Sequence, residues 1–285
     1  MNDPKYLGDH ALITPDKPAL IHGGTGEVLT YRDIDERSNR LAQCLFALGL
    51  RRGDRIAIVM ENNLRYMEVC WAALRSGLLI APVNRYLTAD EAAYIVADSE
   101  ARAVVSSLAM RELADGLSSR MPGCGHRLMV DGTIEGWTSY EQAIAAHPAQ
   151  RLADEWMGGT MFYSSGTTGR PKGIIRAQQG GRVSEGQNAA RLRQMSGYGL
   201  GPDTVYLSPA PMYHAARWSA RCVSAMKRAT SSRPARPGSC ISNGTNRSFS
   251  TTTRHRRPAT RSTRGTRPGP ASGTSAMSTR TATCT

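Results

Sequence analysis

The sequence predicts an α/β fold, a mainly parallel sheet flanked by helices, and two observations lead to this. Between Asp16 and Val105, short apolar segments alternate with longer amphipathic ones at the spacing of strand–helix–strand units. One of the short segments, Arg55–Met60, is apolar over nearly its whole length, as in a strand buried on both faces. The alternation therefore indicates a layered α/β unit.

A β-hairpin and a long helix are expected first. Residues 19–22 and 28–31 frame the turn Gly23–Gly26, which predicts two short antiparallel strands. From Tyr31 to Leu48, apolar residues recur among charged ones at helical spacing, and Gly49 follows as a C-cap.

The same alternation continues to residue 106. After the strand Arg55–Met60, the expected elements are a helix over Leu64–Ser76 stopped by Gly77, a strand over Leu78–Val83, a helix from the cap Thr88 to Val96, and a strand over Ala101–Ser106. Asp90 and Glu91 fall in the first turn of the helix after Thr88, where the helix dipole favours acidic side chains.

Residues 111–150 carry weaker signals. The expected elements there are a turn at Met121–Gly123, a short strand over Arg127–Val130 and a helix over Thr138–Ala146. Further on, Thr160–Phe162 is expected as an apolar turn and Thr204–Ser208 as a buried strand.

Composition excludes several protein classes. A chain of 285 residues is long enough to bury a core, as one large domain or two small ones. Its six cysteines are scattered without a Cys-x-x-Cys pair, which argues against a zinc site or a disulfide framework and fits the cytoplasm. Met1–Lys17 lacks the apolar core of a signal peptide, and no apolar run is long enough to cross a bilayer.

Charge divides the chain into two parts. The formal net charge is +13, yet the segment up to Arg217 holds 23 acidic and 23 basic residues, so the whole excess lies beyond it. Residues 218–285 contain no Leu, Asp or Glu and are rich in Ser, Thr, Arg, Pro and Gly. Such a segment buries too little apolar surface to offset its conformational entropy. The predicted organisation is a folded domain over 1–217 and a disordered basic tail over 218–285.

The basic tail has one alternative interpretation, which is phosphate contact with a nucleic acid through Arg254–Arg257. No DNA- or RNA-binding motif accompanies these residues, so no specific nucleic-acid partner is predicted.

The segment Tyr163–Gly173 has the composition of a phosphate-binding loop. It reads Tyr-Ser-Ser-Gly-Thr-Thr-Gly-Arg-Pro-Lys-Gly. Glycines let backbone N–H groups approach an anion, hydroxyls add donors, and Lys172 adds a mobile positive charge. The segment is not a Walker A loop, because Gly173 follows Lys172 where that motif needs Ser or Thr. A polar surface loop without a ligand is the alternative.

The order of residues in this segment closely resembles the phosphate loop of the adenylate-forming superfamily, which includes acyl-CoA synthetases, aryl-CoA ligases and peptide-synthetase adenylation domains. Leu29-Thr30-Tyr31, Gly53–Ala57 and Ala81–Asn84 are similar to the family's N-terminal landmarks, and the resemblance runs from about residue 15 to about residue 216. It implies the N-terminal subdomains of that fold. It also implies that ATP is held at its pyrophosphate end by Ser164, Ser165, Gly166, Thr167, Thr168, Gly169 and Lys172.

A second candidate site lies at Pro209–Ala216, a proline-flanked segment after the expected strand at 204–208. His214 could be a hydrogen-bonded core histidine. The segment also follows a strand, where ligand sites of open α/β sheets gather. It resembles the family's Pro-Leu/Met-Tyr/Phe-His motif. The resemblance implies that His214 is catalytic, shaping the acyl and adenylate site, with Tyr213 as a wall of the substrate pocket.

The resemblance implies a two-step reaction. A carboxylate attacks the α-phosphate of ATP, which gives an acyl-adenylate, and coenzyme A thiolate then displaces AMP. ATP, Mg²⁺ and coenzyme A are the implied cofactors, and the substrate is a small-molecule carboxylic acid, fatty or aromatic. The family's Tyr-Gly-x-Thr-Glu motif has no counterpart here. The chain is therefore expected to be inactive alone, or to be an ATP-binding remnant without turnover, and no metal-ligating residue is assigned.

We hypothesise that the tail is coding sequence of the same family read in a shifted frame. With GC-rich codons, reading Gly273–Thr285 one base earlier allows Gly-Asp-Val-Gly-Tyr-Val-Asp-Glu-Asp-Gly-Tyr-Leu-Tyr. This string resembles the family's Gly-Asp-x-Gly segment, whose aspartate contacts the ATP ribose. Sequencing the gene tests the hypothesis, and an intact frame in independent isolates would count against it.

Overall fold

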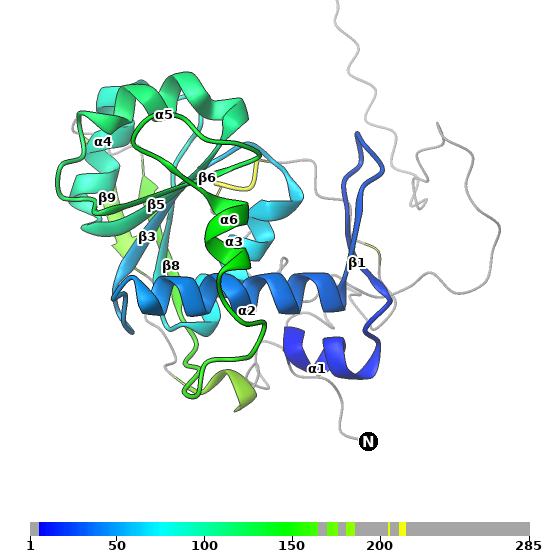
Figure 1. The fold of residues 1–285 in the computed structure, drawn as a ribbon. Coiled ribbons are helices and arrows are strands. Elements are labelled where there is room, and N and C mark those ends of the chain that lie inside the picture. Colours follow the sequence, from blue (N-terminus) through cyan, green and yellow to red (C-terminus); the bar gives the residue numbers. More distant parts are fainter. Residues whose placement is uncertain (1–5, 165–169, 176–180, 186–204, 206–210, 215–285) are drawn as a thin grey trace, which may run out of the picture. The chain divides into compact units, whose positions relative to one another are not determined.

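A computed structural model describes residues 6–164, 170–175, 181–185, 205 and 211–214. Its principal strands are β3 (Arg55–Val59), β4 (Leu79–Pro82), β5 (Ala101–Ser107), β6 (His126–Val130), β7 (Thr138–Ser139), β8 (Gly159–Ser164) and β9 (Lys172–Ile175). They form one sheet in the order β7-β6-β5-β3-β4-β8-β9 (Figure 1). Neighbouring strands are parallel except β8 and β9, which are antiparallel. The predicted α/β fold with a mainly parallel sheet is confirmed.

The helices and a separate hairpin complete the described part of the chain. The hairpin pairs β1 (Pro18–Ile21) with β2 (Val28–Thr30). The α-helices are α1 (Leu7–Ile13), α2 (Tyr31–Ala47), α3 (Leu64–Arg75), α4 (Ala89–Asp98), α5 (Arg111–Ser118) and α6 (Tyr140–Ala145), and two short 3₁₀ turns cover Leu108–Met110 and Val183–Glu185. In these ranges no helix is both long and apolar enough to cross a membrane.

Alternate residues of each central strand face opposite layers of helices (Figure 1). On β3, Ile56 and Ile58 belong to the core packed against α2, α3 and α6. Ala57 and Val59 belong to the core packed against α4 and α5. Since both faces are covered, β3 after Arg55 and β4 consist of apolar residues, as the segment Arg55–Met60 indicated.

Local sequence signals explain where the long helices begin and end. The Thr30 side chain accepts a hydrogen bond from the Asp33 N–H, and the Asp33 carboxylate accepts one from the Thr30 N–H, which is a capping box at the start of α2. Thr88 and Glu91 form the same arrangement at α4. At the predicted C-cap Gly49 (φ +87°), the chain turns back toward the last turn of α2.

The structure differs from the sequence-based predictions at four elements. Thr138 and Ser139 were predicted as the start of a helix and instead form strand β7, because they pair with β6. The apolar segment Thr160–Phe162 was predicted as a turn and is instead part of strand β8, because it pairs with β4 and β9. Helices α1 and α5 were not predicted. The seven-residue α1 depends on packing, with Leu7 buried against α2 and the His10 ring stacked on Tyr31 at 4.8 Å.

Other predictions beyond residue 175 are only partly open to comparison. Val205 is the one described residue of the expected buried strand Thr204–Ser208, and its side chain is exposed. Residues 215–285 lie outside the described ranges, so the boundary at residue 217 and the disordered tail stay predictions.

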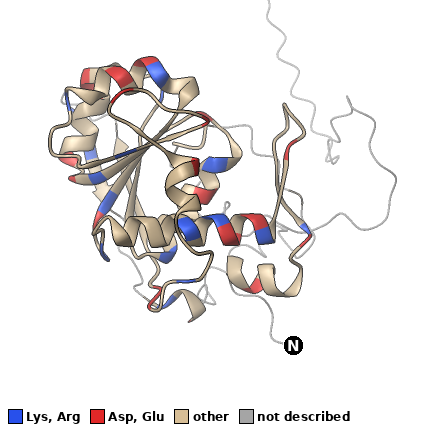
Figure 2. Ribbon diagram, in the orientation of Figure 1, with Lys and Arg blue, Asp and Glu red and all other residues tan. Residues whose placement is uncertain are grey.

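Helices α2, α3 and α5 carry both acidic and basic residues, whereas α1, α4 and α6 carry Asp or Glu but no Lys or Arg (Figure 2). On α2 both signs occur within its first three turns. This distribution agrees with the balance of charge in the sequence before Arg217.

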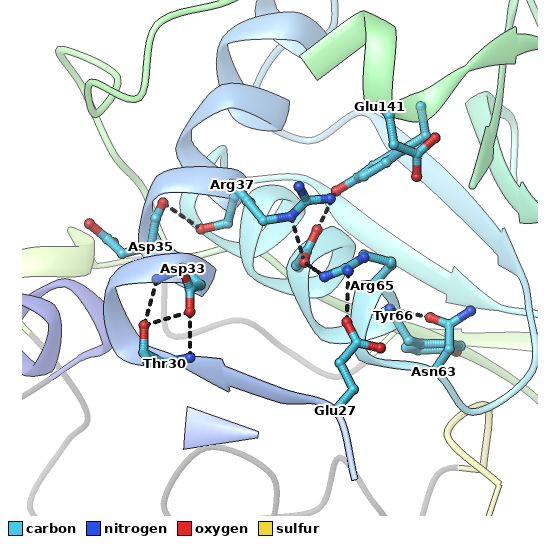
Figure 3. Close-up of polar contacts among 12 residues, drawn as sticks. Glu27, Thr30, Asp33, Asp35, Arg37, Asn63, Arg65, Tyr66 and Glu141 are labelled. Carbon is cyan, nitrogen blue, oxygen red and sulfur yellow. Dashed lines mark hydrogen bonds and ion pairs between the residues drawn. The ribbon is translucent and has the colours of Figure 1, made fainter. Parts of the chain in front are cut away.

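One buried carboxylate joins three helices. The Glu68 side chain on α3 is fully buried, and its Oε1 accepts hydrogen bonds from Arg37 Nε on α2 at 2.8 Å and from Arg65 Nη1 at 2.6 Å. Its Oε2 accepts a hydrogen bond from Tyr140 Oη on α6 at 3.0 Å. Figure 3 shows Arg37 and Arg65 converging on this point. Burial and the neighbouring Glu68 raise the pKa of Tyr140 well above its usual value, so the phenol stays protonated and donates.

We expect Glu68→Gln to lower the free energy of unfolding by about 3 kcal/mol, because two arginines would lose their buried counter-charge. The exposed Glu36 on α2 offers a matched control, and Glu36→Gln should change stability by about 0.5 kcal/mol or less. Urea unfolding followed by circular dichroism measures both. Equal stabilities of the two variants would contradict the role given to Glu68.

Candidate functional site

The carboxyl ends of the parallel strands meet at one edge of the sheet, where the direction of winding reverses. The chain passes from β3 to β4 on one side and then crosses to β5 on the other. Open α/β sheets bind ligands at such a reversal, outside the carboxyl ends of the strands. The ends of β3 and β5 are joined there by a hydrogen bond from the Ser107 hydroxyl to the Glu61 carboxylate.

The predicted phosphate loop connects two paired strands at this same edge. Ser164 is the last residue of β8 and Lys172 the first of β9, and the two are direct Cα partners across the hairpin. Lys172 is exposed. The other predicted loop residues, Ser165, Gly166, Thr167, Thr168 and Gly169, lie outside the described residues. The structure thus places the two ends of the predicted loop side by side.

A close backbone approach determines where β8 joins the sheet. The Gly158 N–H donates to the Leu74 carbonyl at 2.6 Å, and the Gly159 N–H donates to the Leu78 carbonyl at 3.0 Å. A Cβ on Gly158 would overlap the Leu78 carbonyl oxygen and lie 3.0 Å from that of Ala73. These are backbone atoms that cannot move aside, so only glycine fits between the end of α3 and β4.

Helix α4 contacts β8 and the two residues that precede β9. Tyr163 Oη donates to Asp98 Oδ2 at 2.7 Å, and Tyr94 Oη donates to the Pro171 carbonyl at 3.1 Å. The Arg170 guanidinium lies 5.2 Å from the centre of the Tyr94 ring. Burial, together with the nearby Asp98 carboxylate, raises the pKa of Tyr163 above its usual value, so this phenol is a hydrogen-bond donor at neutral pH.

The second predicted site lies beside the end of β3. The Met212 N–H donates to Asn62 Oδ1 at 2.8 Å, and the His214 N–H donates to the Pro211 carbonyl at 3.1 Å, which closes a turn. Tyr213 is half-buried and His214 is exposed. The alternative of a core histidine is therefore wrong, whereas the catalytic and pocket roles of His214 and Tyr213 stay predictions.

The sheet brings the two predicted sites to the same edge. Strands β3 and β8 are separated only by β4, which corresponds to about 10 Å at the usual strand spacing. Asn62 follows β3, and Ser164 ends β8. A ligand at this edge would lie within reach of both segments.

Four residues at the site were not predicted as functional: Asn62, Tyr94, Asp98 and Gly158. Asn62 carried one usable signal, since it lies two residues after the predicted buried strand Arg55–Met60. The other three act through partners distant in the chain, so the sequence alone offers no signal for them.

In the part of the chain that the structure describes, no group of three or more His, Cys, Asp or Glu side chains is placed to hold a metal ion. The Mg²⁺ implied by the family resemblance is therefore not assigned to any residue.

One protein-family model matches the sequence of this chain. A sequence model of the family described as "AMP-binding enzyme" matches residues 8–238. The chain belongs to the AMP-binding enzyme family. The match spans most of the chain and includes both predicted sites, so the resemblance read from the phosphate loop is confirmed.

Curated members of the AMP-binding family include similar CoA ligases. The chain is 27% identical over 235 residues to the long-chain-fatty-acid–CoA ligase FadD13 of Mycobacterium tuberculosis, covering 79% of this chain and 43% of that protein. It is 28% identical over 216 residues to a long-chain-fatty-acid–CoA ligase of Thermus thermophilus, covering 75% and 39%. The chain thus spans less than half the length of these relatives.

The fold agrees with solved AMP-binding structures. The inhibitor-bound N-terminal domain of FACL13 from Mycobacterium tuberculosis superposes with a TM-score of 0.61 at 24% identity, over 73% of this chain and 50% of that one. At this identity the likeness shows the fold alone. The predicted N-terminal subdomains of the adenylate-forming fold are confirmed.

We expect Gly158→Ala to lower the free energy of unfolding by about 3 kcal/mol, the upper end for overpacking, because its Cβ meets fixed backbone. Gly123→Ala is the matched control, since an added Cβ there has no atom within 4 Å. Urea unfolding of both variants checks the prediction. A G158A variant as stable as G123A would show that β8 can join the sheet without this approach.

Proposed function

We propose that this chain binds ATP through the β8–β9 hairpin and descends from acid–CoA ligases. In the reaction of those enzymes, a substrate carboxylate attacks the α-phosphate of ATP, forming a C(O)–O–P bond as pyrophosphate leaves. The thiolate of coenzyme A then attacks the acyl carbon, and AMP leaves. The first step requires the phosphates to be held and their charge to be stabilised.

One observation carries the proposal: the two ends of a glycine- and hydroxyl-rich loop lie side by side at the ligand-binding edge of a parallel sheet. Ser164 and Lys172 are direct partners across β8 and β9. Glycine- and hydroxyl-rich loops can turn successive backbone N–H groups toward one point, which suits an anion. The exposed ammonium of Lys172 can follow the β- and γ-phosphates.

In this proposal each predicted residue has a defined task. Lys172 offsets negative charge on the phosphates, and Ser164 donates from the end of β8. We assign the remaining phosphate donors to Ser165, Gly166, Thr167, Thr168 and Gly169. His214 and Tyr213, on the turn tied to Asn62, would shape the acyl and adenylate pocket at the same edge. Mg²⁺ would accompany the nucleotide, and coenzyme A would take part only in the second step.

We further propose that these 285 residues by themselves bind ATP without efficient turnover. The sequence contains no Tyr-Gly-x-Thr-Glu string, whose residues in the family bind adenine and Mg²⁺. Phosphate contacts alone hold the nucleotide but do not align a carboxylate with its α-phosphorus.

The substrate class follows from the relatives and stays broad. Similar proteins are named as ligases of long-chain fatty acids, of 4-coumarate and of crotonobetaine or carnitine. Each name denotes a carboxylic acid joined to CoA, so a small-molecule carboxylic acid is the proposed substrate class. Fatty and aromatic acids both remain open.

Replacement of Lys172 tests the ATP site. We expect Lys172→Ala to weaken ATP binding about tenfold, because a charge-assisted hydrogen bond contributes about 1.5 kcal/mol. Lys17→Ala is the matched control. Lys17 directly precedes β1, in the separate hairpin, so its replacement should leave the ATP affinity unchanged. Isothermal titration calorimetry with ATP measures both variants.

Turnover is tested separately by ATP–pyrophosphate exchange with a panel of fatty and aromatic acids. Exchange should stay at background for the chain alone. Robust exchange that disappears in Lys172→Ala would refute inactivity while supporting the site. Equal ATP affinity of Lys172→Ala and Lys17→Ala would refute the site itself.

A further inference from the structure

Two side chains of helix α4, Tyr94 and Asp98, contact the hairpin on either side of the predicted loop. We propose that Tyr94 and Asp98 are positioning residues that hold the two ends of the phosphate loop at the separation needed to bind ATP. We call Tyr94, Asp98 and Tyr163 the α4 clamp. The inference rests on the proposed function, since it explains how the same loop is kept in place.

The clamp holds the strand that enters the loop. Tyr163 lies on β8 immediately before Ser164, and its hydroxyl donates to Asp98 Oδ2 at 2.7 Å. The two residues are 65 positions apart in the chain, so this contact fixes β8 against α4. The short distance and the ionised acceptor make it the strongest hydrogen bond of the clamp.

The clamp also holds the end of the loop just before β9. The single hydroxyl hydrogen of Tyr94 is directed at the Pro171 carbonyl, 3.1 Å away, and the same oxygen lies 3.4 Å from Asp98 Oδ1. Pro171 directly precedes Lys172. The Arg170 guanidinium stacks over the Tyr94 ring at 5.2 Å, which adds a second contact on this side.

The two halves of the clamp meet across the hairpin. Tyr163 is the Cα partner of Gly173, and a Cβ on Gly173 would overlap the end of Met161 and come within 3.2 Å of the Tyr163 ring. Glycine therefore lets the Tyr163 ring cross the neighbouring strand and place its hydroxyl at Asp98. The loop is bounded by Ser164 and Lys172, each adjacent to a clamped residue.

These contacts are not needed to pack α4 itself. The helix is held by the buried side chains Ala92, Ala93, Ile95 and Val96, whereas Tyr94 is half-buried and Asp98 is exposed. Asp98 also ends the helix, where the macrodipole disfavours a negative charge. A residue that opposes a local rule while accepting the hydrogen bond of Tyr163 is better explained by a task at the hairpin than by helix stability.

Three variants of the full chain test the clamp. Tyr94→Phe removes one hydroxyl and keeps the ring beneath Arg170. Asp98→Ala removes both acceptor oxygens, while Asp98→Asn keeps one oxygen for Tyr163 and an amide that can donate to Tyr94. Tyr86→Phe is the matched control, because Tyr86 is an exposed tyrosine elsewhere on the same edge of the sheet. Each variant is measured by hydrogen–deuterium exchange without ligand, by ATP calorimetry and by urea unfolding.

We expect Tyr94→Phe and Asp98→Ala to speed amide exchange in peptides spanning residues 164–175 and to weaken ATP binding about fivefold, the equivalent of one hydrogen bond. Their unfolding midpoints should stay near wild type. Asp98→Asn should recover most of the ATP affinity, and Tyr86→Phe should match wild type throughout. Recovery of ATP affinity in Asp98→Asn would show that Asp98→Ala weakens binding because the hairpin loses its hydrogen bond and not because the whole protein is destabilised.

Other results would overturn the inference. Unchanged exchange in Tyr94→Phe and Asp98→Ala would show that these groups do not hold the hairpin. Faster exchange with unchanged ATP affinity would show that the contacts do not position the loop for ATP. If the wild-type chain bound no ATP, the proposed function would be wrong, and the exchange rates would still decide whether the clamp holds the hairpin.

Discussion

The arrangement of the site depends on one close backbone approach, where Gly158 passes between the last turn of α3 and the start of β4. With no Cβ, the chain can hydrogen-bond to the Leu74 and Leu78 carbonyls and enter the sheet as β8. That entry sets the parallel register of β8 on β4 and hence the edge at which Ser164 emerges. A side chain at residue 158 would displace β8 and the loop that follows it.

The parallel sheet brings together segments of the site that are far apart in the sequence. Parallel strands deliver their carboxyl ends to a common edge, so the loop after β8 and the turn tied to Asn62 after β3 come near each other. Buried polar contacts keep the surrounding helices in register, as Glu68 does for α2, α3 and α6. The packed layers thus act as a scaffold, and the connections at the carboxyl ends of the strands are where a ligand would bind.

The chain belongs to the AMP-binding family, and its β8–β9 hairpin places Ser164 beside Lys172 at the carboxyl edge of the sheet. Both observations support the proposal that the hairpin holds the phosphates of ATP. The motif that the family resemblance assigns to adenine and Mg²⁺ does not occur in the 285-residue sequence, and no Asp or Glu follows Arg217 in that sequence. These sequence features support the proposal that the chain binds ATP without efficient turnover.

Sequence alone determined the elements whose signals are local. The capping residue Thr88, the C-cap Gly49 and the apolar strand Arg55–Met60 each depend on neighbours within a few positions, so they were predicted correctly. The phosphate loop at Ser164–Lys172 is a prediction from the order of residues in that segment. Tertiary structure decided that Thr160–Phe162 is a strand, that His214 is exposed and that α4 contacts Tyr163 and Pro171. Those outcomes rest on contacts between residues tens of positions apart, which local propensity does not encode.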